Sequence, residues 1–338
     1  MLRVSGAMAV SRRLRRRQLL ILTYHGVMPA ERIGPMPLNR NVIDTDAFRW
    51  QMQSIGASFT CVGLSSALAS FRSGRPLPPR PVAVTFDDGF ANNLEFAYPI
   101  LRSLGIPSTL FLTTGHVGGG ARPLWTEWLT LVVTRTSQTT LTLHGEGRER
   151  SWNLDDSGDR VRTAAELLRE AKRLSADPRR QLLADLERQL GTPALSEDEL
   201  RFRYRFLTWQ EIGAADPGLV DWGSHTVNHE ILSTVDDEKL RRELTDSKRA
   251  IEGCTGRPCE LFSYPNGASG DFGPREERAL SEMGYAGAVT QIPGFNTARS
   301  DPYALRRINI GRGLSPETFE ALVSGVWHPL RRTIGGWA

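Results

Sequence analysis

PVAVTFDDG, residues 81–89, places two adjacent acids, Asp87 and Asp88, at the end of an apolar run and follows them with Gly89. An unbroken apolar run is typical of a strand that is buried on both faces. Successive side chains on a strand point to opposite faces, so both carboxylates reach one site only if the chain leaves the strand there. Gly89 permits that turn. A turn that serves only as a cap is the alternative, because Asp-Asp-Gly is also common turn chemistry.

Comparable apolar runs alternate with helical stretches along most of the chain. The predicted strands are 18–25, 81–88, 108–114, 219–224, 260–265, 286–291 and 304–311. The predicted helices are 46–57, 93–105, 237–256, 274–285 and 315–325. This alternation predicts an α/β fold with mainly parallel strands.

Residues 122–207 interrupt the alternation. They contain a polar, hairpin-like stretch at 139–154 and two charged amphipathic helices, predicted at 159–191 and 196–206. Because this region holds no cluster of chemically capable residues, we predict an insertion within a domain that spans 18–320. Such an insertion would form a lid or one wall of a cleft.

The two ends of the chain are predicted to lie outside this domain. Residues 1–17 contain the basic run SRRLRRR, which we interpret as a short solvated tail, with binding to acidic lipid or nucleic acid as the alternative. Residues 321–338 are predicted to form a C-terminal extension.

The composition is that of a soluble globular protein, with 40% hydrophobic and 24% charged residues. A net charge of only +4 predicts no nucleic-acid partner.

No stretch reaches the ~20 apolar residues of a membrane-spanning helix. The apolar run before Thr23 is shorter than the ~7–15 residues of a secretory signal, so we expect a cytoplasmic protein by default. Three cysteines imply no disulfide framework.

Polar residues follow several predicted strands. They are His25, Asp87 with Asp88, His116, His225, and the sequence Tyr264-Pro265-Asn266. In parallel α/β folds, functional groups gather at the carboxyl ends of the strands. These residues are therefore predicted to converge on one site.

The sequence SHTVNH, residues 224–229, places His225 and His229 four residues apart. On a helical turn this spacing puts both imidazoles on one face, close enough to share a metal ion. Alone, the spacing also fits a surface or capping role. With Asp88 it gives two imidazoles and one carboxylate, a common ligand set for a divalent metal. Asp87 then stays free to accept a proton from metal-activated water.

Three motifs in this order resemble those of the polysaccharide deacetylase family, also called the nodulation-type chitooligosaccharide deacetylases or carbohydrate esterase family four. They are TFDDG at 85–89, SHTVNH at 224–229 and FSYPNG at 262–267. Fainter similarity covers ILTYHGV, LTWQEI, SKRAIE and ALRRINI, so that the resemblance spans most of 18–320 apart from the insertion. It implies a distorted (β/α) barrel of about seven mainly parallel strands. It also implies metal-dependent hydrolysis of N- or O-acetyl groups on carbohydrates.

The resemblance assigns roles by motif position. Asp87 matches the catalytic base, and the metal ligands match Asp88, His225 and His229. The implied cofactor is a divalent ion, with zinc first and cobalt or nickel as alternatives. Tyr264, Pro265 and Asn266 match a groove motif whose backbone amide could donate to the oxyanion, although a proline-containing strand exit is the alternative.

The sequence also departs from the family pattern. The arginine that steadies the catalytic aspartate aligns with Ser263, so this support would come from elsewhere, with Arg306 and Arg307 as the candidates. The late histidine that serves as general acid is absent, and His328 is interpreted as structural. This leaves the acid unassigned. Residues that could assist at the site are His25 and His116, each of which also fits a purely structural role, and Trp125, which could stack on a sugar ring.

Three functional hypotheses follow. The first is a metal-dependent deacetylase of an N-acetylated polysaccharide, oligosaccharide or glycolipid. The second keeps the fold and the metal but acts on a non-carbohydrate amide. The third is a non-catalytic carbohydrate-binding or assembly protein with a vestigial site, which the intact Asp87, Asp88, His225 and His229 disfavour.

Overall fold

A parallel β-sheet forms the centre of the computed structural model, which describes residues 2–34, 40–120, 123–145 and 148–326. The strands run in the order β11-β10-β9-β6-β5-β1-β12, and β4 also pairs with β5. Their bounds are β1 Leu20–Tyr24, β4 Thr60–Cys61, β5 Pro81–Phe86, β6 Ser108–Leu112, β9 Val220–Ser224, β10 Leu261–Ser263, β11 Gly287–Val289 and β12 Ile308–Asn309. Every pairing among them is parallel.

The sheet curls into a distorted barrel, as the motifs predict. The segment before and within β12 reaches both edges of the sheet, because Leu305 pairs with Val289 at one edge and Ile308 pairs with Leu22 at the other. All residues of β1, β5 and β6 are buried, which explains why these strands appear in the sequence as apolar runs instead of alternating patterns.

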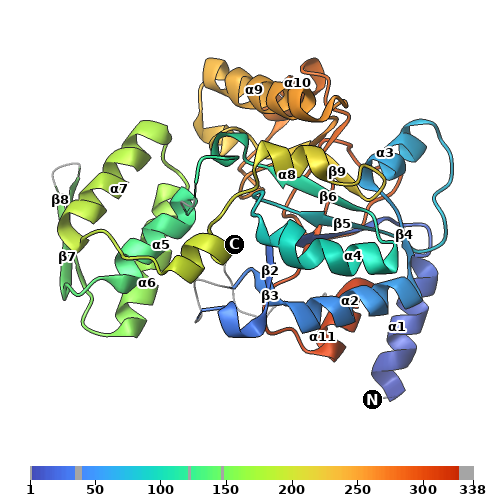
Figure 1. Cartoon of the computed structure of the whole chain (residues 1–338), viewed down its shortest axis with the longest axis horizontal. Helices are drawn as coiled ribbons and strands as arrows, with labels where there is room; N and C mark the ends of the chain where they lie inside the picture. Colours follow the sequence, from blue (N-terminus) through green and yellow to red (C-terminus); the bar gives the residue numbers. More distant parts are fainter. Residues whose placement is uncertain (1, 35–39, 121–122, 146–147, 327–338) are drawn as a thin grey trace.

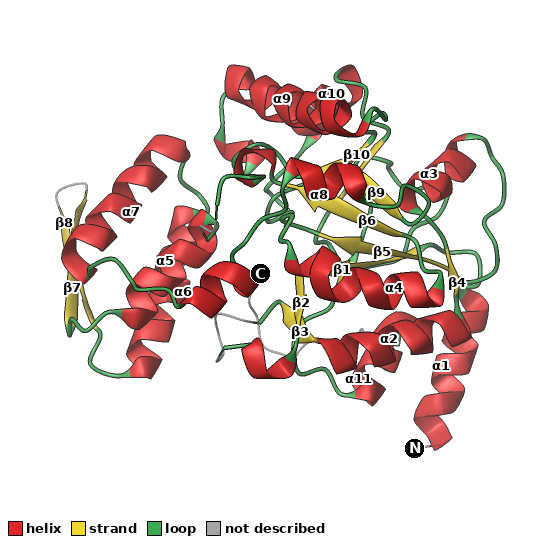
Figure 2. Ribbon diagram, viewed as in Figure 1, coloured by secondary structure: helices red, strands yellow, loops and turns green. Residues whose placement is uncertain are grey.

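Helices surround the sheet (Figures 1 and 2). The α-helices of the barrel are α2 Thr45–Ser58, α3 Leu64–Arg72, α4 Tyr98–Leu104, α8 Trp209–Ala214, α9 Asp237–Thr255, α10 Pro274–Glu282 and α11 Pro316–Ser324. Single turns are η1 Ala30–Arg32, η2 Asn93–Ala97, η3 Thr114–His116, η4 Glu199–Arg203 and η5 Leu232–Thr234. All five helices predicted for the barrel are present, whereas α3, α8 and a small ladder of β2 Gly26–Met28 with β3 Val42–Asp44 were not predicted.

The region predicted as an insertion forms a compact group to one side of the barrel, at the left of Figure 1. It comprises α5 Trp125–Arg135, β7 Thr140–Gly145, β8 Arg148–Asn153, α6 Ser157–Ala171 and α7 Ala176–Leu190. We call these five elements the arm. They enclose an apolar cluster of their own, which includes Leu129, Val132, Leu141, Leu167 and Leu186.

Two helix predictions for this region differ from the structure. The helix predicted at 159–191 is divided into α6 and α7, since Pro178 in the first turn of α7 has no backbone N–H and would clash within a continuous helix. The helix predicted at 196–206 is reduced to the single turn η4.

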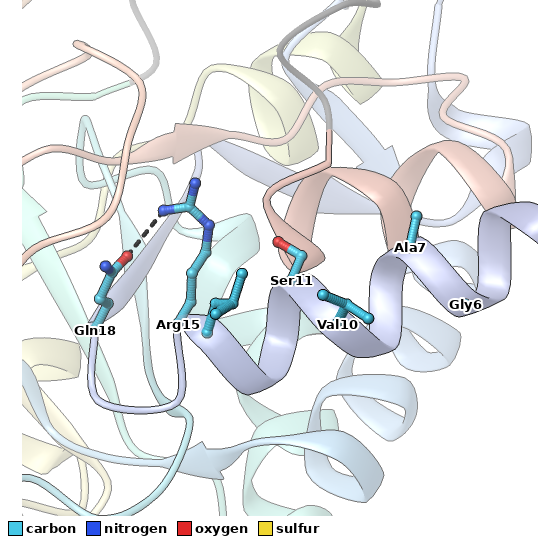
Figure 3. A pocket seen from close by; sticks show the side chains of 7 residues that line it. Gly6, Ala7, Val10, Ser11, Arg15 and Gln18 are labelled. Atoms are coloured by element: carbon cyan, nitrogen blue, oxygen red, sulfur yellow. Dashed lines mark hydrogen bonds between the residues drawn. The ribbon is translucent and has the colours of Figure 1, made fainter.

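The N-terminal segment is helical, whereas the sequence predicts a solvated tail. Helix α1, Leu2–Leu14, packs against α11. Ser11 Oγ donates a hydrogen bond to the carbonyl oxygen of Ser324 at 2.6 Å, and Arg12 forms an ion pair with Glu320. Part of the basic run is therefore paired with the barrel. A hollow of about 520 Å³ lies beside this helix, and Arg15, one of its lining residues, donates to Gln18 at 2.9 Å. Figure 3 shows the side chains that line it.

No helix in the described ranges combines the length and the apolar character that crossing a bilayer requires. His328 and most of the predicted C-terminal extension lie outside the described residues.

Candidate active site

The chain turns sharply at the end of β5. Asp88 and Gly89 both have left-handed backbone conformations, with φ of 76° and 86°. The amide of Gly89 donates to the carbonyl oxygen of Asp87 at 3.0 Å. A positive φ at a residue with a side chain costs about 1–3 kcal/mol and is concentrated at functional sites. The turn therefore gives a physical account of the two adjacent acids, since it brings both to the same end of the barrel.

Asp87 lies inside the barrel against Arg307, and the two side chains are 2% and 0% exposed. Arg307 binds both carboxylate oxygens, with Nη1 at 2.8 Å from Oδ1 and Nη2 at 2.6 Å from Oδ2. Ser263 Oγ and Gln291 Nε2 also donate to Oδ2, at 3.2 and 3.1 Å. Burial alone would raise the pKa of Asp87, but Arg307 and nearby histidines hold this pKa below its usual value.

The two arginines proposed as support for the acid have opposite orientations. Arg307 points into the barrel, whereas Arg306 is exposed and its side chain lies over Gly294. Consecutive residues of an extended segment face opposite sides, so only one of them can reach Asp87. Ser263, which aligns with the expected arginine, accepts a hydrogen bond from Arg307 Nη2 at 2.9 Å.

Asp88, His225 and His229 form a buried cluster whose ligand atoms all lie within 4.8 Å of one another. Asp88 Oδ1 is 3.6 Å from His225 Nε2 and 3.5 Å from His229 Nε2. Two ligands at ~2.0–2.1 Å from a tetrahedral zinc ion are about 3.4 Å apart, so these separations fit a shared ion better than direct hydrogen bonds. Burial would raise the pKa of Asp88, yet the imidazoles hold this pKa well below its usual range.

The two imidazoles are held differently. His225 Nδ1 lies 2.7 Å from the carbonyl oxygen of Ser263, to which it donates in the tautomer that leaves the Nε2 lone pair facing Asp88. His229 Nδ1 is buried and has no hydrogen-bond partner in the described structure. Burial lowers the pKa of His229, against a smaller opposite effect of Asp88, and this favours the neutral form that binds metals.

Residues 225–231, which we call the histidine loop, follow β9 without forming a helical turn, so the predicted helical geometry is wrong. Instead, Thr226 and His229 have φ of 68° and 56°. The loop is held by the buried carboxylate of Glu243 on α9, which accepts from the amides of Val227 and Asn228 at 2.7 and 3.0 Å. Both imidazoles therefore face Asp88 because of turns and a distant acid, not because of helical periodicity.

The loop also packs closely against η3. The amide of Gly115 donates to the carbonyl oxygen of Val227 at 2.8 Å, and a Cβ at Gly115 would lie only 2.7 Å from that oxygen. Gly115 is thus required by the close approach of two backbones.

The segment Tyr264-Pro265-Asn266 follows β10 beside this cluster. The Tyr264 hydroxyl donates to the carbonyl oxygen of Tyr303 at 3.0 Å, its ring stacks on Phe272, and its amide donates to Val289. Asn266 has a φ of 62° and its side chain donates to Asp271 at 2.5 Å. In the described part of the chain, the backbone N–H of Asn266 has no acceptor, whereas that of Tyr264 is engaged in the sheet.

Three further residues predicted near the site have distinct surroundings. Burial lowers the pKa of His25, against the smaller opposing effects of the charges of Asp88 and Asp87. His116 in η3 packs against Phe206 with the rings tilted at 37° and 4.7 Å between their centroids. The indole N–H of Trp125 donates to the carbonyl oxygen of His229 at 3.1 Å, which makes this residue a support of the histidine loop as well as a candidate sugar platform.

Two residues at the site were missed. Gln291 is the last residue of the strand predicted at 286–291, so the rule that polar strand ends converge on the site could have identified it. Glu243 lies within α9, three residues after Leu240 and four before Ser247, so the helical spacing of the buried stripe could have identified it as an acid on the buried face.

The polysaccharide deacetylase family profile matches residues 74–147 and 209–288, which include TFDDG, SHTVNH and FSYPNG. The unmatched stretch, 148–208, covers most of the predicted insertion. A curated relative, YxkH of Bacillus subtilis, whose name places it among the polysaccharide deacetylases, is 27% identical over 103 residues. That alignment spans 30% of this chain and 36% of the relative, so the relative is matched over only about a third of its length.

Solved structures share the fold. The deacetylase PplD of Streptococcus pyogenes, solved with acetate, has a TM-score of 0.60 at 17% identity, over 91% of this chain and 99% of that one. The polysaccharide deacetylase BC0361 of Bacillus cereus has a TM-score of 0.57 at 16% identity, over 91% and 69%. Together with the profile match, these findings confirm the resemblance to the polysaccharide deacetylase family and the distorted (β/α) barrel.

Proposed function

From its resemblance to the polysaccharide deacetylases, we propose that this chain is a metal-dependent hydrolase of acetyl groups on a carbohydrate. The bond cleaved would be the N-acetyl amide of an amino sugar in a polysaccharide, oligosaccharide or glycolipid. The observation that carries the proposal is the side-by-side placement of two acids with opposite surroundings. Asp88 faces two imidazoles, while Asp87 is paired with Arg307.

Asp88, His225 and His229 would hold the metal ion. Two imidazoles and a carboxylate leave open coordination positions, and this donor set suits zinc first, with cobalt or nickel as alternatives. When bound, the ion supplies Lewis-acid activation of water and of the acetyl carbonyl.

Asp87 would act as the base. Among the described residues, three donors contact its Oδ2, namely Arg307 Nη2, Ser263 and Gln291, and a single one, Arg307 Nη1, contacts its Oδ1. Oδ1 therefore retains a lone pair that can accept a proton from the attacking water. Arg307 keeps the carboxylate ionised and fixes its plane, which makes Arg307 a positioning residue.

The turn after β10 would bind the oxyanion. The backbone N–H of Asn266, which follows Tyr264 and Pro265, is the candidate donor, because the amide of Tyr264 is already used by the sheet. A preorganised backbone N–H of this kind stabilises negative charge as it develops on the carbonyl oxygen.

The test is acetate release from a panel of acetylated oligosaccharides and bacterial exopolysaccharides. The protein would be used as purified, after treatment with a chelator, and after reloading with Zn²⁺, Co²⁺ or Ni²⁺. We expect release to disappear with the chelator and to return with metal. Small non-carbohydrate amides form a second arm, and hydrolysis of these alone would favour the amidohydrolase hypothesis. A protein that binds metal and glycan but releases no acetate would contradict the proposal.

A further inference from the structure

The arm contacts the histidine loop at His229 itself. Trp125, the first residue of α5, donates its indole N–H to the carbonyl oxygen of His229 at 3.1 Å. This bond holds the backbone of a proposed metal ligand whose φ of 56° lies in the left-handed region. A residue of the arm thus fixes the peptide unit that carries one of the two imidazoles.

A second contact lies one residue further along the loop. Arg179 from α7 forms an ion pair with Glu230, and their side chains are 4% and 7% exposed. The Arg179 guanidinium also lies over the Trp125 ring, 4.4 Å from its centroid, and donates to the carbonyl oxygen of Leu174 at 3.2 Å. Arg179 therefore links both loop contacts within the arm.

Glu230 is held from two sides. Its Oε1 accepts from Lys239 of α9 at 2.6 Å, while its Oε2 is paired with Arg179. Removing Arg179 leaves Oε2 of this buried carboxylate without its partner while Lys239 still pairs with Oε1, and the chain relieves this imbalance by moving or by losing stability. The conformation of the loop at residues 229–230 therefore depends on the docked arm.

The position of His229 is constrained mainly through its backbone, because its imidazole ring has no orienting hydrogen bond among the described residues. His225 is oriented through its Nδ1, which lies 2.7 Å from a carbonyl oxygen, whereas the buried Nδ1 of His229 has no partner among the described residues. Metal-binding histidines are usually oriented by a hydrogen bond from the second ring nitrogen. For His229, the contacts on its own carbonyl group and on Glu230 take over this task.

We infer that the arm is a positioning element for the metal site, acting through Trp125 and Arg179. Neither Trp125 nor Arg179 is among the proposed metal ligands, and they set the geometry with which His229 meets the ion. The inference rests on the proposed metal site, and it assigns the region between the first two motifs a role beyond that of a lid or wall.

Zn²⁺ affinity of the full chain, measured by competition with a chromophoric chelator, tests the inference. Trp125→Phe keeps an aromatic ring beneath Arg179 but removes the donor to His229. Trp128→Phe is the matched control, because Trp128 lies one turn further along α5 and its indole donates to Glu187 within the arm. We expect Trp125→Phe and Arg179→Met to weaken Zn²⁺ binding by about 10–100-fold, with Trp128→Phe unchanged.

Arg179→Lys and the double variant Arg179→Met/Glu230→Met separate positioning from simple stability. Lysine should restore part of the affinity, and the double variant should unfold at a higher temperature than either single change in the metal-free protein. The Co²⁺ visible spectrum should change in Trp125→Phe, since it reports ligand geometry.

Two results would overturn the inference in distinguishable ways. If wild type binds Zn²⁺ and both Trp125→Phe and Arg179→Met bind it equally tightly, the arm has no positioning role, even if these variants are less stable. If wild type binds no Zn²⁺ at all, the proposed function fails and the inference fails with it.

Discussion

Two adjacent aspartates, Asp87 in the interior of the barrel and Asp88 at its mouth, have opposite surroundings. In the interior, Asp87 receives four hydrogen bonds, two of them from one guanidinium. At the mouth, Asp88 faces two imidazoles at distances that suit a shared ion. The comparison shows that neighbours, not residue type, divide the proposed work between a base and a ligand.

The largest effect is expected when the negative charge of Asp87 is removed. Asp87→Asn removes the proton acceptor, so acetate release should fall by about 10²–10⁴-fold. Zn²⁺ affinity should stay the same, because Asp88 and the imidazoles are untouched. The matched variant Asp88→Asn should lose both activity and metal. Activity and chelator competition measured on both variants check this, and an active Asp87→Asn protein would reject the assignment.

Replacing either histidine tests the proposed metal site at the mouth of the barrel and leaves Asp87 unchanged. His225→Ala or His229→Ala takes away one of the three proposed metal ligands, so Zn²⁺ affinity should fall by more than about 100-fold, with acetate release falling in parallel. Equilibrium dialysis with Zn²⁺ and activity at saturating metal provide the measurements. Unchanged metal content in either variant would mean that the ion binds elsewhere.

Replacing Arg307 tests the ion pair with Asp87 in the interior of the barrel. Arg307→Met leaves the buried Asp87 carboxylate without its counter-charge, which should lower the free energy of unfolding by about 3–5 kcal/mol. Arg306→Met is the control, since Arg306 is exposed and should change this free energy by less than about 0.5 kcal/mol. Urea unfolding of the metal-free proteins gives both values. Equal effects at the two positions would contradict the pairing.

A third acid, Asp221, provides a comparison with the paired Asp87, because Asp221 forms no ion pair among the described residues. Burial raises the pKa of Asp221, with a smaller lowering by the amide of Trp222, the opposite net direction from Asp87. A carboxyl with a raised pKa stabilises the fold below its unfolded pKa, about 3.9, and this contribution is lost as pH rises through the folded pKa. Asp221→Asn should therefore stabilise the protein slightly at pH 7 and not at pH 3. Urea unfolding at both pH values measures this, and a loss of stability at pH 7 would contradict it.

Much of the barrel can be predicted from the sequence because its strands are buried on both faces. β1, β5 and β6 appear as apolar runs, and His25 and the two acids directly follow β1 and β5. The ladder of β2 and β3 was missed although the equally short β10 and β11 were predicted, because β2 begins only two residues after β1 ends and the sequence does not separate the two strands.

The rest depends on contacts between distant segments. The choice between Arg306 and Arg307 requires the register of the segment that joins the two edges of the sheet, which neighbouring residues do not determine. The histidine loop is shaped by Glu243, and the arm reaches the loop through Arg179 and Glu230, 51 residues apart. Such pairings leave no local pattern in the sequence.

Because the last strand closes the barrel, the residues of the candidate site come together in a fixed order during synthesis. During synthesis, both acids and both histidines leave the ribosome well before Arg307. Until the segment around Leu305 and Ile308 joins the sheet edges, Asp87 has no guanidinium partner. A nascent or truncated chain that ends before this segment would contain the proposed base and every proposed ligand, but its Asp87 would lack the cation that holds the carboxylate ionised and in position.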